Sequence, residues 1–233
     1  MCGAATSTSA PQCQYCGSRL AMVSCPSCFG MMFLGSKHCP RCGAVAARQD
    51  TIAESGRKCP RCLVQMQSVV IGQATVLECA GCSGLWLDTA SFEKICADRE
   101  QQSAVLGTAS HLPSSAVTAG SAVRYVPCPE CSQLMNRMNF ARCSGVIIDL
   151  CKKHGIWFDC DELSRIVEFI RGGGLELSRS REKAQLEEER RRLRQEQMTA
   201  NLHRSVGSGI GDSEALRISG IASAGGLLKF LLD

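Results

Sequence analysis

The chain has 233 residues, of which 17 are cysteines and only 5% are aromatic, and its formal net charge is +4. So few aromatic residues argue against one large core, and small domains of this kind need metals or disulfides for stability. Disulfides are disfavoured because the cysteine count is odd, the first twenty residues have no apolar signal-peptide core, and twelve cysteines fall in Cys-x-x-Cys pairs. That spacing is typical of metal sites, and we expect a cytoplasmic protein without a membrane span.

The N-terminal region, residues 1–49, contains three Cys-x-x-Cys pairs and four basic residues but no acidic residue. Ten residues separate Cys28 from Cys39, and ten also separate Cys2 from Cys13, which suggests two zinc ribbons in one register. The second ribbon has four thiolates, the ligand set of a closed structural zinc site: Cys25, Cys28, Cys39 and Cys42. His38 is expected to lie outside this set, and residues 29–34 predict a short apolar strand that covers the metal.

The first ribbon of this region is incomplete. Its remaining cysteines, Cys2, Cys13 and Cys16, form a partial metal site, and its opening cysteine would lie three positions before Cys2. One interpretation is that Met1 lies inside a ribbon, either because the start is mis-assigned or because the ribbon is truncated. The alternative is that Cys2 is an unrelated free thiol.

A short linker is predicted at residues 44–56, and a first zinc ribbon repeat at 57–100. The ligands of this repeat are two pairs separated by sixteen residues: Cys59, Cys62, Cys79 and Cys82. Between the pairs, the β-prone runs at 67–71 and 74–78 predict a hairpin that turns at Gly72-Gln73.

A Ser-, Ala-, Thr- and Gly-rich linker is predicted at residues 101–123, and a second repeat at 124–174. The ligands of the second repeat are Cys128, Cys131, Cys151 and His154. Replacing one thiolate with an imidazole keeps a tetrahedral site. Cys143 is a competing ligand, but only the Cys151/His154 pair is followed by the glycine, tryptophan and aspartate that also follow Cys82.

The repeated segment contains Trp86 and Asp88 in the first repeat, and Trp157 and Asp159 in the second. We expect each aspartate to cap a helix, because a carboxylate there accepts hydrogen bonds from free amides. Asp88 would cap a helix at 89–99, on whose Phe92 and Ile95 face Trp86 is expected to pack. Asp159 and Glu162 predict a capping box for a helix with a Leu163, Ile166, Val167 and Ile170 stripe, which stops at Gly172-Gly173-Gly174.

The C-terminal part is predicted as a charged helix at residues 175–204 and a Gly- and Ser-rich tail with an apolar end at 205–233. Glutamates three or four residues before arginines favour a solvent-exposed helix in this segment. Leu186 and Leu193 are seven apart, which is compatible with a coiled coil and with a homo-oligomer formed through this helix.

The repeated pattern of two ligand pairs followed by Gly-x-Trp-x-Asp resembles the small zinc ribbon of bacterial and archaeal proteins named for transcription factor IIB. The resemblance covers residues 58–99 and 126–171, and the N-terminal ribbons resemble the double-zinc-ribbon type. It implies a bacterial protein with rubredoxin-like knuckles and zinc binding, and little about activity. The expected fold is a small metal-stabilised α+β protein: tandem rubredoxin-like zinc ribbons made of β-hairpin knuckles, each repeat followed by a short helix, and a C-terminal charged helix.

These patterns favour a zinc-binding protein without enzymatic activity, with about three Zn2+ ions per chain. Four protein ligands leave no open position on the metal, and the chain has no glycine-rich phosphate loop and no nucleophile–base set. We expect an adaptor or regulatory protein that contacts a protein, with a nucleic acid as the other candidate partner. Only Tyr15, Phe29 and Phe33 could stack on bases in the N-terminal region.

The alternative function is a redox or metal-responsive protein that uses its Cys-x-x-Cys sites. Under this hypothesis Cys160 is the thiol to test, because it lies at a predicted helix N-terminus, where a thiolate is favoured. We also expect that Cys79→Ser unfolds its own repeat and spares the other.

Overall fold

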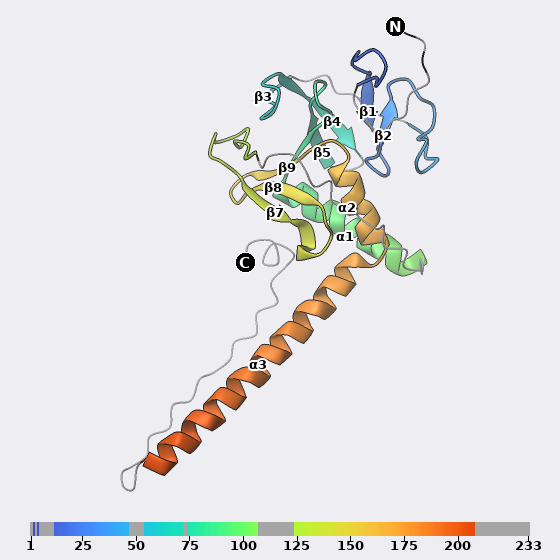
Figure 1. Ribbon diagram of the computed structural model, residues 1–233. Coiled ribbons are helices and arrows are strands. Elements are labelled where there is room, and N and C mark those ends of the chain that lie inside the picture. Colours follow the sequence, from blue (N-terminus) through green and yellow to red (C-terminus); the bar gives the residue numbers. More distant parts are fainter. Residues whose placement is uncertain are drawn as a thin grey trace.

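The structure is a computed structural model that describes residues 12–46, 54–71, 74–106 and 124–207, together with Cys2 and Ala4. Several predicted features lie outside the described residues: the turn at Gly72-Gln73, residues 47–53 of the first linker, residues 107–123 of the second linker, and the apolar C-terminal end. Within the described residues, a head of sheets and short helices carries one long helix that extends away from it (Figure 1).

The head is built on a seven-stranded antiparallel sheet with the order β3-β4-β5-β6-β9-β8-β7. The first repeat supplies β3 (Glu54–Lys58), β4 (Gln65–Ile71), β5 (Ala74–Glu78) and β6 (Leu85–Asp88). The second repeat supplies β7 (Asn136–Asn139), β8 (Ile147–Cys151) and β9 (Gly155–Phe158). The hairpin predicted from the runs at 67–71 and 74–78 is present as β4 and β5, but residues 54–56, predicted as linker, already belong to β3.

The two repeats join where β6 pairs with β9. Trp86 lies opposite Trp157 in this antiparallel pair, and Asp88 lies opposite Gly155. The two copies of Gly-x-Trp-x-Asp therefore pair with each other through their backbones. The repeats are halves of one sheet, and the expectation of separate tandem modules is wrong in this respect.

The two faces of the sheet carry different cores because successive side chains of a strand point to opposite sides. Leu85 and Leu87 pack on the helix side, in a cluster with Phe92 and Ile95 that also includes side chains of the second repeat. Trp86 lies between them in the strand and packs on the other side, among the cysteines of the knuckles. The prediction that Trp86 packs on the helix is therefore wrong, and strand alternation is the reason.

Helices α1 (Thr89–Leu106) and α2 (Glu162–Arg171) cover the helix side of the sheet, and a 3-10 turn, η1 (Phe140–Arg142), packs against the same core. Helix α1 continues past Arg99, so residues 101–106 are helical and do not form part of a linker. The predicted stop at Gly172-Gly173-Gly174 is only a break. Gly173 has φ +77°, and α3 (Gly174–Gly207) begins at the next residue.

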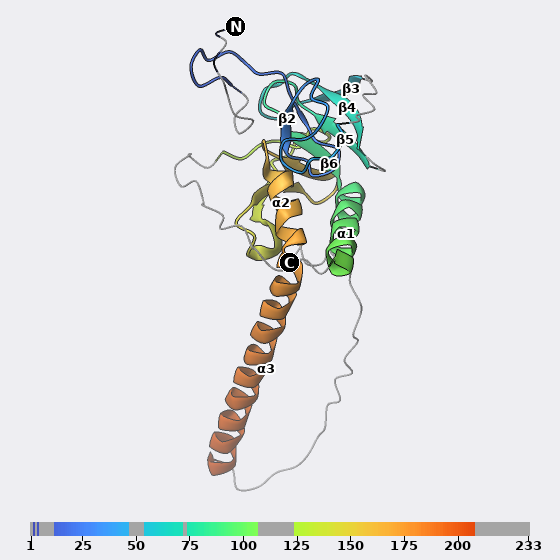
Figure 2. The same ribbon diagram turned by 90° about the vertical axis from the view of Figure 1, so that its right-hand side faces the viewer.

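Helix α3 is anchored at its N-terminal end and exposed along most of its length. Leu175 belongs to the helix-side core, the Ser178 hydroxyl donates a hydrogen bond to the Ala141 carbonyl at 2.8 Å, and Arg179 pairs with Glu100 of α1. From residue 183 to residue 201, every described side chain is exposed. Figures 1 and 2 show this part of α3 extending away from the head in both views.

The N-terminal ribbon forms a separate two-stranded sheet of β1 (Met22–Ser24) and β2 (Met31–Phe33). It is attached to both repeats. The backbone amide and the hydroxyl of Ser24 each donate to the buried Glu78 carboxylate of β5 at 2.9 Å. Arg41 contacts α2 and the residue before it, through Asp161 at 2.6 Å and Glu168 at 2.8 Å.

Candidate metal centres

Three groups of four metal-type ligands lie in the described part of the chain. In each group the ligand atoms are within 4.8 Å of one another: Cys25, Cys28, Cys39 and Cys42; Cys59, Cys62, Cys79 and Cys82; and Cys128, Cys131, Cys151 and His154. The structure thus brings together all twelve residues that the sequence predicts as ligands. Cys143 packs against the helix-side core, and the exposed His38 pairs with Val45 in an isolated bridge, so neither joins a group.

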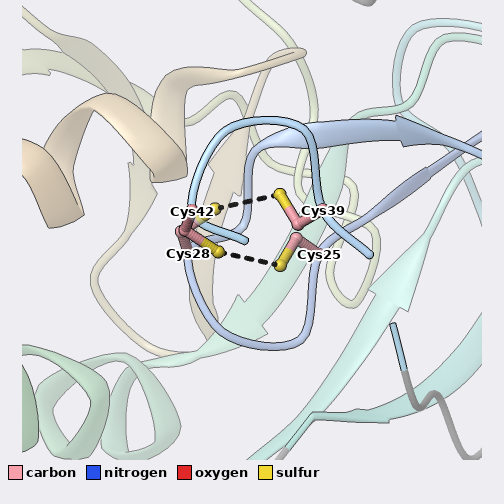
Figure 3. A group of neighbouring side chains, drawn as sticks. All are labelled: Cys25, Cys28, Cys39 and Cys42. Atoms are coloured by element: carbon pink, nitrogen blue, oxygen red, sulfur yellow. Dashed lines mark hydrogen bonds between the residues drawn. The ribbon is translucent and has the colours of Figure 1, made fainter. Parts of the chain in front are cut away.

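The distances within these groups fit a tetrahedral zinc ion. Zinc–sulfur bonds of about 2.3 Å place two sulfur ligands about 3.8 Å apart. The Sγ atoms of Cys25 and Cys42 are 3.8 Å apart, and those of Cys59 and Cys82 are 3.6 Å apart. Figure 3 shows the four sulfurs of the N-terminal group pointing toward one another from two loops. The donor set and its spacing therefore accommodate Zn2+.

The cysteine pairs are held in a recurring backbone loop, here called a knuckle. In each knuckle the first cysteine donates its amide hydrogen bond to the carbonyl five residues on, and its carbonyl accepts from the amide four residues on. The residue directly after the second cysteine has a positive φ between 57° and 72° in every case: Gly17, Phe29, Gly43, Leu63, Ser83 and Ser132. A left-handed residue there reverses the chain and turns backbone amides toward the sulfur atoms.

Backbone amides next to the cysteines donate weak hydrogen bonds to the thiol sulfurs. The amide of Arg41 lies 3.4 Å from the Cys39 Sγ, and the amide of Gly81 lies 3.3 Å from the Cys79 Sγ. Such donors favour the thiolate form, which is the form that binds a metal. Both the backbone amides and the cysteine side chains of the knuckles are thus arranged for metal binding.

The third group closes differently because its last pair is Cys151 and His154. These residues occupy the short turn between β8 and β9, where the amide of His154 donates to the Cys151 carbonyl at 3.2 Å. The His154 Nδ1 lies 3.4 Å from the Cys151 Sγ and 3.7 Å from the Cys128 Sγ. This position directs Nδ1 toward the centre of the group.

The second and third groups share one core with the two tryptophans. Cys59 and Cys79 of the first repeat belong to the same cluster as Cys128 and Cys151 of the second. Trp86 and Trp157, 2% and 0% exposed, lie in this cluster. Loss of either centre would therefore disturb side chains that pack on the other.

The two aspartates of the repeated segment have different roles. Asp88 caps α1 as predicted, because its Oδ1 accepts a hydrogen bond from the Ser91 amide at 2.8 Å. Asp159 does not cap α2 with its carboxylate, because that group accepts from the Trp157 indole at 2.9 Å and from Arg61. Only half of the predicted capping box is present, in which the Asp159 amide donates to Glu162 at 2.8 Å.

Arg61 is a functional residue that the sequence reading missed. It lies inside the first knuckle of repeat one, and its guanidinium makes two hydrogen bonds to Asp159, with the Nε at 2.7 Å from the Oδ1. Arg41 occupies the same place in the knuckle Cys39-Pro40-Arg41-Cys42 and pairs with Asp161, which precedes α2, and with Glu168 within α2. Both knuckles have the sequence Cys-Pro-Arg-Cys, and this shared sequence was the signal by which Arg61 could have been found.

Asp149 lies in the same group of charges and is 3% exposed. Burial raises the pKa of Asp149 to about 6, although the positive charges of Arg137 and Arg61 act in the opposite direction. The closest approach of Arg61 to this carboxylate is 3.8 Å. Arg61, in a loop of the first repeat, therefore partly neutralises the negative charge of two carboxylates of the second repeat.

We predict that Arg61→Ala lowers the free energy of unfolding by about 2 kcal/mol, because it leaves the partly buried Asp159 carboxylate without its two charged hydrogen bonds. The matched control is Arg57→Ala, which removes an arginine more exposed than Arg61 whose single ion pair within the described residues, with Glu130, also joins the two repeats. This control should cost less than about 1 kcal/mol. Denaturant unfolding of the zinc-loaded proteins measures both values, and equal losses would contradict the role given to Arg61.

Cys160 lies in surroundings that disfavour the thiolate expected from its position. Burial, together with the nearby carboxylates of Asp161 and Asp159, raises the pKa of Cys160 to about 11. The residue at the N-cap of α2 is Asp161, whose side chain makes no capping bond. Burial and the nearby carboxylates thus act against the thiolate that the sequence predicted at this position.

Comparison with known proteins supports the zinc assignment for the first repeat. Residues 58–98 match the family described as a transcription factor zinc-finger, of the TFIIB zinc ribbon type. No curated protein and no solved structure matched the chain. The match and the cysteine groups together indicate a zinc-binding, metal-stabilised α+β protein. Among the described residues, no helix has the length and apolar character needed to cross a membrane.

Proposed function

We propose that the protein is a non-enzymatic adaptor of the cytoplasm, in which structural zinc ions stabilise the head and α3 binds a protein partner. The observation that carries the proposal is the ligand set of the three complete centres. Each has four protein ligands, which leaves the metal without a position for substrate or water. The two aspartates of the repeated segment already have structural partners, since Asp88 caps α1 and Asp159 binds Arg61.

Helix α3 supports the choice of a binding surface. It has 34 residues, which corresponds to a length of about 50 Å. Its exposed part carries Leu186, Leu193 and Met198, with acidic residues at 187–189 and basic residues at 190–192. An isolated helix of this kind has little stability of its own. Association with another helix would stabilise it by burying its apolar side chains.

A protein partner is favoured over a nucleic acid by the placement of the basic and aromatic residues. Arg41 and Arg61 are paired with carboxylates of the second repeat and its helix. Phe29 is 2% exposed and cannot stack on a base, whereas Tyr15 is 67% exposed. In the described part of the N-terminal region, Arg19, Lys37 and Tyr15 remain exposed, which is a small set for a groove that follows a phosphate backbone.

A photo-crosslinking amino acid placed at Leu193 of the full-length, zinc-loaded protein tests the proposal in cells that naturally produce it. We expect one discrete crosslinked protein from this position. The matched control is Leu134, a head residue that is 71% exposed, which should give no such product. A product made of two copies of the chain would identify a homo-oligomer formed through α3. Crosslinking to nucleic acid, or equal products from both positions, would contradict the proposed role.

A further inference from the structure

A fourth cysteine group lies in the part of the N-terminal region that precedes the complete ribbon. The ligand atoms of Cys2, Cys13 and Cys16 are all within 4.8 Å of one another. The Sγ atoms of Cys2 and Cys13 are 3.7 Å apart, close to the spacing of about 3.8 Å expected for two sulfurs on one zinc ion. Three cysteines from two segments of the chain thus converge at metal-binding distance.

The loop that holds two of these cysteines is a fully formed knuckle. The Cys13 amide donates to the Ser18 carbonyl at 2.8 Å, and the Gly17 amide donates to the Cys13 carbonyl at 2.9 Å. Gly17 follows the second cysteine and has φ +67°, a positive value like that of the corresponding residue in the other five knuckles. The bridge between Gln12 and Arg19 closes the base of the loop. This backbone matches the loops of the complete centres.

This knuckle also lies against the head. A Cβ atom added at Gly81, in the second knuckle of repeat one, would lie 3.5 Å from the Arg19 guanidinium. Arg19 immediately follows the loop of Cys13 and Cys16, and its guanidinium therefore lies near Gly81 and the second metal centre.

The fourth group differs from the other three in its number of ligands and in its exposure. The described residues provide no fourth cysteine, histidine or carboxylate at this place. Cys2 and Cys16 are exposed, and only Cys13, 5% exposed, is buried. In each complete centre at least two of the four ligands are buried. Among the described residues, the fourth group therefore has three ligands, and two of them are exposed to solvent.

We propose that Cys2, Cys13 and Cys16 form an open metal site that binds one Zn2+ ion and leaves its fourth position to an exchangeable external ligand. Three thiolates suit a borderline-soft divalent metal, and water, an imidazole or a small thiol can complete the tetrahedron. The three complete centres would retain their zinc while this one exchanges it. The proposal goes beyond the adaptor role and does not depend on it.

Zinc release from the full-length protein tests this site. We expect four zinc ions per chain by native mass spectrometry, one for each cysteine group. A chromogenic chelator should remove one of them at least about tenfold faster than the rest, because it can enter the open position. Cys16→Ser should remove the fast fraction and leave three zinc ions. The matched control is Cys143→Ser, at a cysteine outside every group, which should keep all four.

Cobalt substitution gives an independent readout of the open position. Imidazole added to the Co2+-loaded protein should change the visible spectrum of one ion, and Cys2→Ser and Cys16→Ser should each abolish the change. A chain with three metal ions, a fast fraction that persists in Cys16→Ser, or a cobalt spectrum without response to imidazole would overturn the proposal. The crosslinking result at Leu193 is unaffected by any of these outcomes, so the two proposals can fail separately.

Discussion

Replacing Cys79 with serine is expected to unfold both zinc ribbon repeats together. Cys79 is 0% exposed and is one of four ligands of the second metal centre. A structural zinc ion contributes on the order of ten kcal/mol to folding. Domains of this size are stable by only about 5–15 kcal/mol, so loss of one ion removes most of the stability that holds the sheet.

The expected extent of unfolding follows from the shared core. Cys59 and Cys79 pack in the same cluster as Cys128, Cys151 and Trp157 of the other repeat. Strand β9 has β6 of the first repeat as one of its two neighbours in the sheet. If the first repeat unfolds, β9 loses this neighbour and Trp157 becomes exposed. The sequence-based expectation that the second repeat is spared is therefore replaced by cooperative loss.

Hydrogen exchange of the zinc-loaded proteins measures this effect. In Cys79→Ser, peptides from β8, β9 and α2 should lose protection together with peptides from β4 and β5. Cys143→Ser serves as the control, because Cys143 lies outside every ligand group and should keep protection in both repeats. Native protection of β8 and β9 in Cys79→Ser would mean that the second repeat folds by itself.

The ligands of the metal centres could be predicted from sequence because their spacing is local. A knuckle is formed by residues within a span of six, so a Cys-x-x-Cys pair defines its own loop geometry. His154 was preferred to Cys143 by the sequence that follows it, and the structure places His154 in the group. The capping role of Asp88 was predictable for the same reason, since its partner, Ser91, is three residues away.

The missed features depend on partners that are distant in sequence. Asp88 and Asp159 follow the same tryptophan pattern, but Asp159 binds Arg61, which is 98 residues away. The shared Cys-Pro-Arg-Cys sequence marks this arginine, but it does not indicate which carboxylate the arginine reaches. The pairing of Trp86 with Trp157 is also non-local, because each segment alone is only a short apolar strand. The sequence predicted each half of the sheet and contained no signal for their junction.

The junction makes Gly155 the most sensitive glycine of the sheet. A Cβ atom at this position would lie 2.2 Å from the Leu87 carbonyl oxygen and 3.0 Å from the Asp88 Cα. Both atoms belong to the backbone of β6, so no side-chain rotation can relieve the clash. We expect Gly155→Ala to cost about 3 kcal/mol or more, since β9 must move away from β6 and lose hydrogen bonds with it.

Denaturant unfolding of zinc-loaded Gly155→Ala and of Gly81→Ala provides the comparison. A Cβ at Gly81 would meet its nearest neighbour, the Cys62 Sγ, at 3.4 Å, an ordinary contact, so this control should lose less than about 1 kcal/mol. Gly155 follows His154 directly, and Gly81 lies between the ligands Cys79 and Cys82, so the zinc content of both variants must be measured as well. Retained zinc with a large loss of stability would show that the junction, and not the metal, was damaged. Equal stability of the two variants would instead mean that β6 and β9 do not pair in solution. The cooperative unfolding predicted for Cys79→Ser requires that pairing, because the backbone contact between β6 and β9 is what carries the loss of one zinc centre into the other repeat.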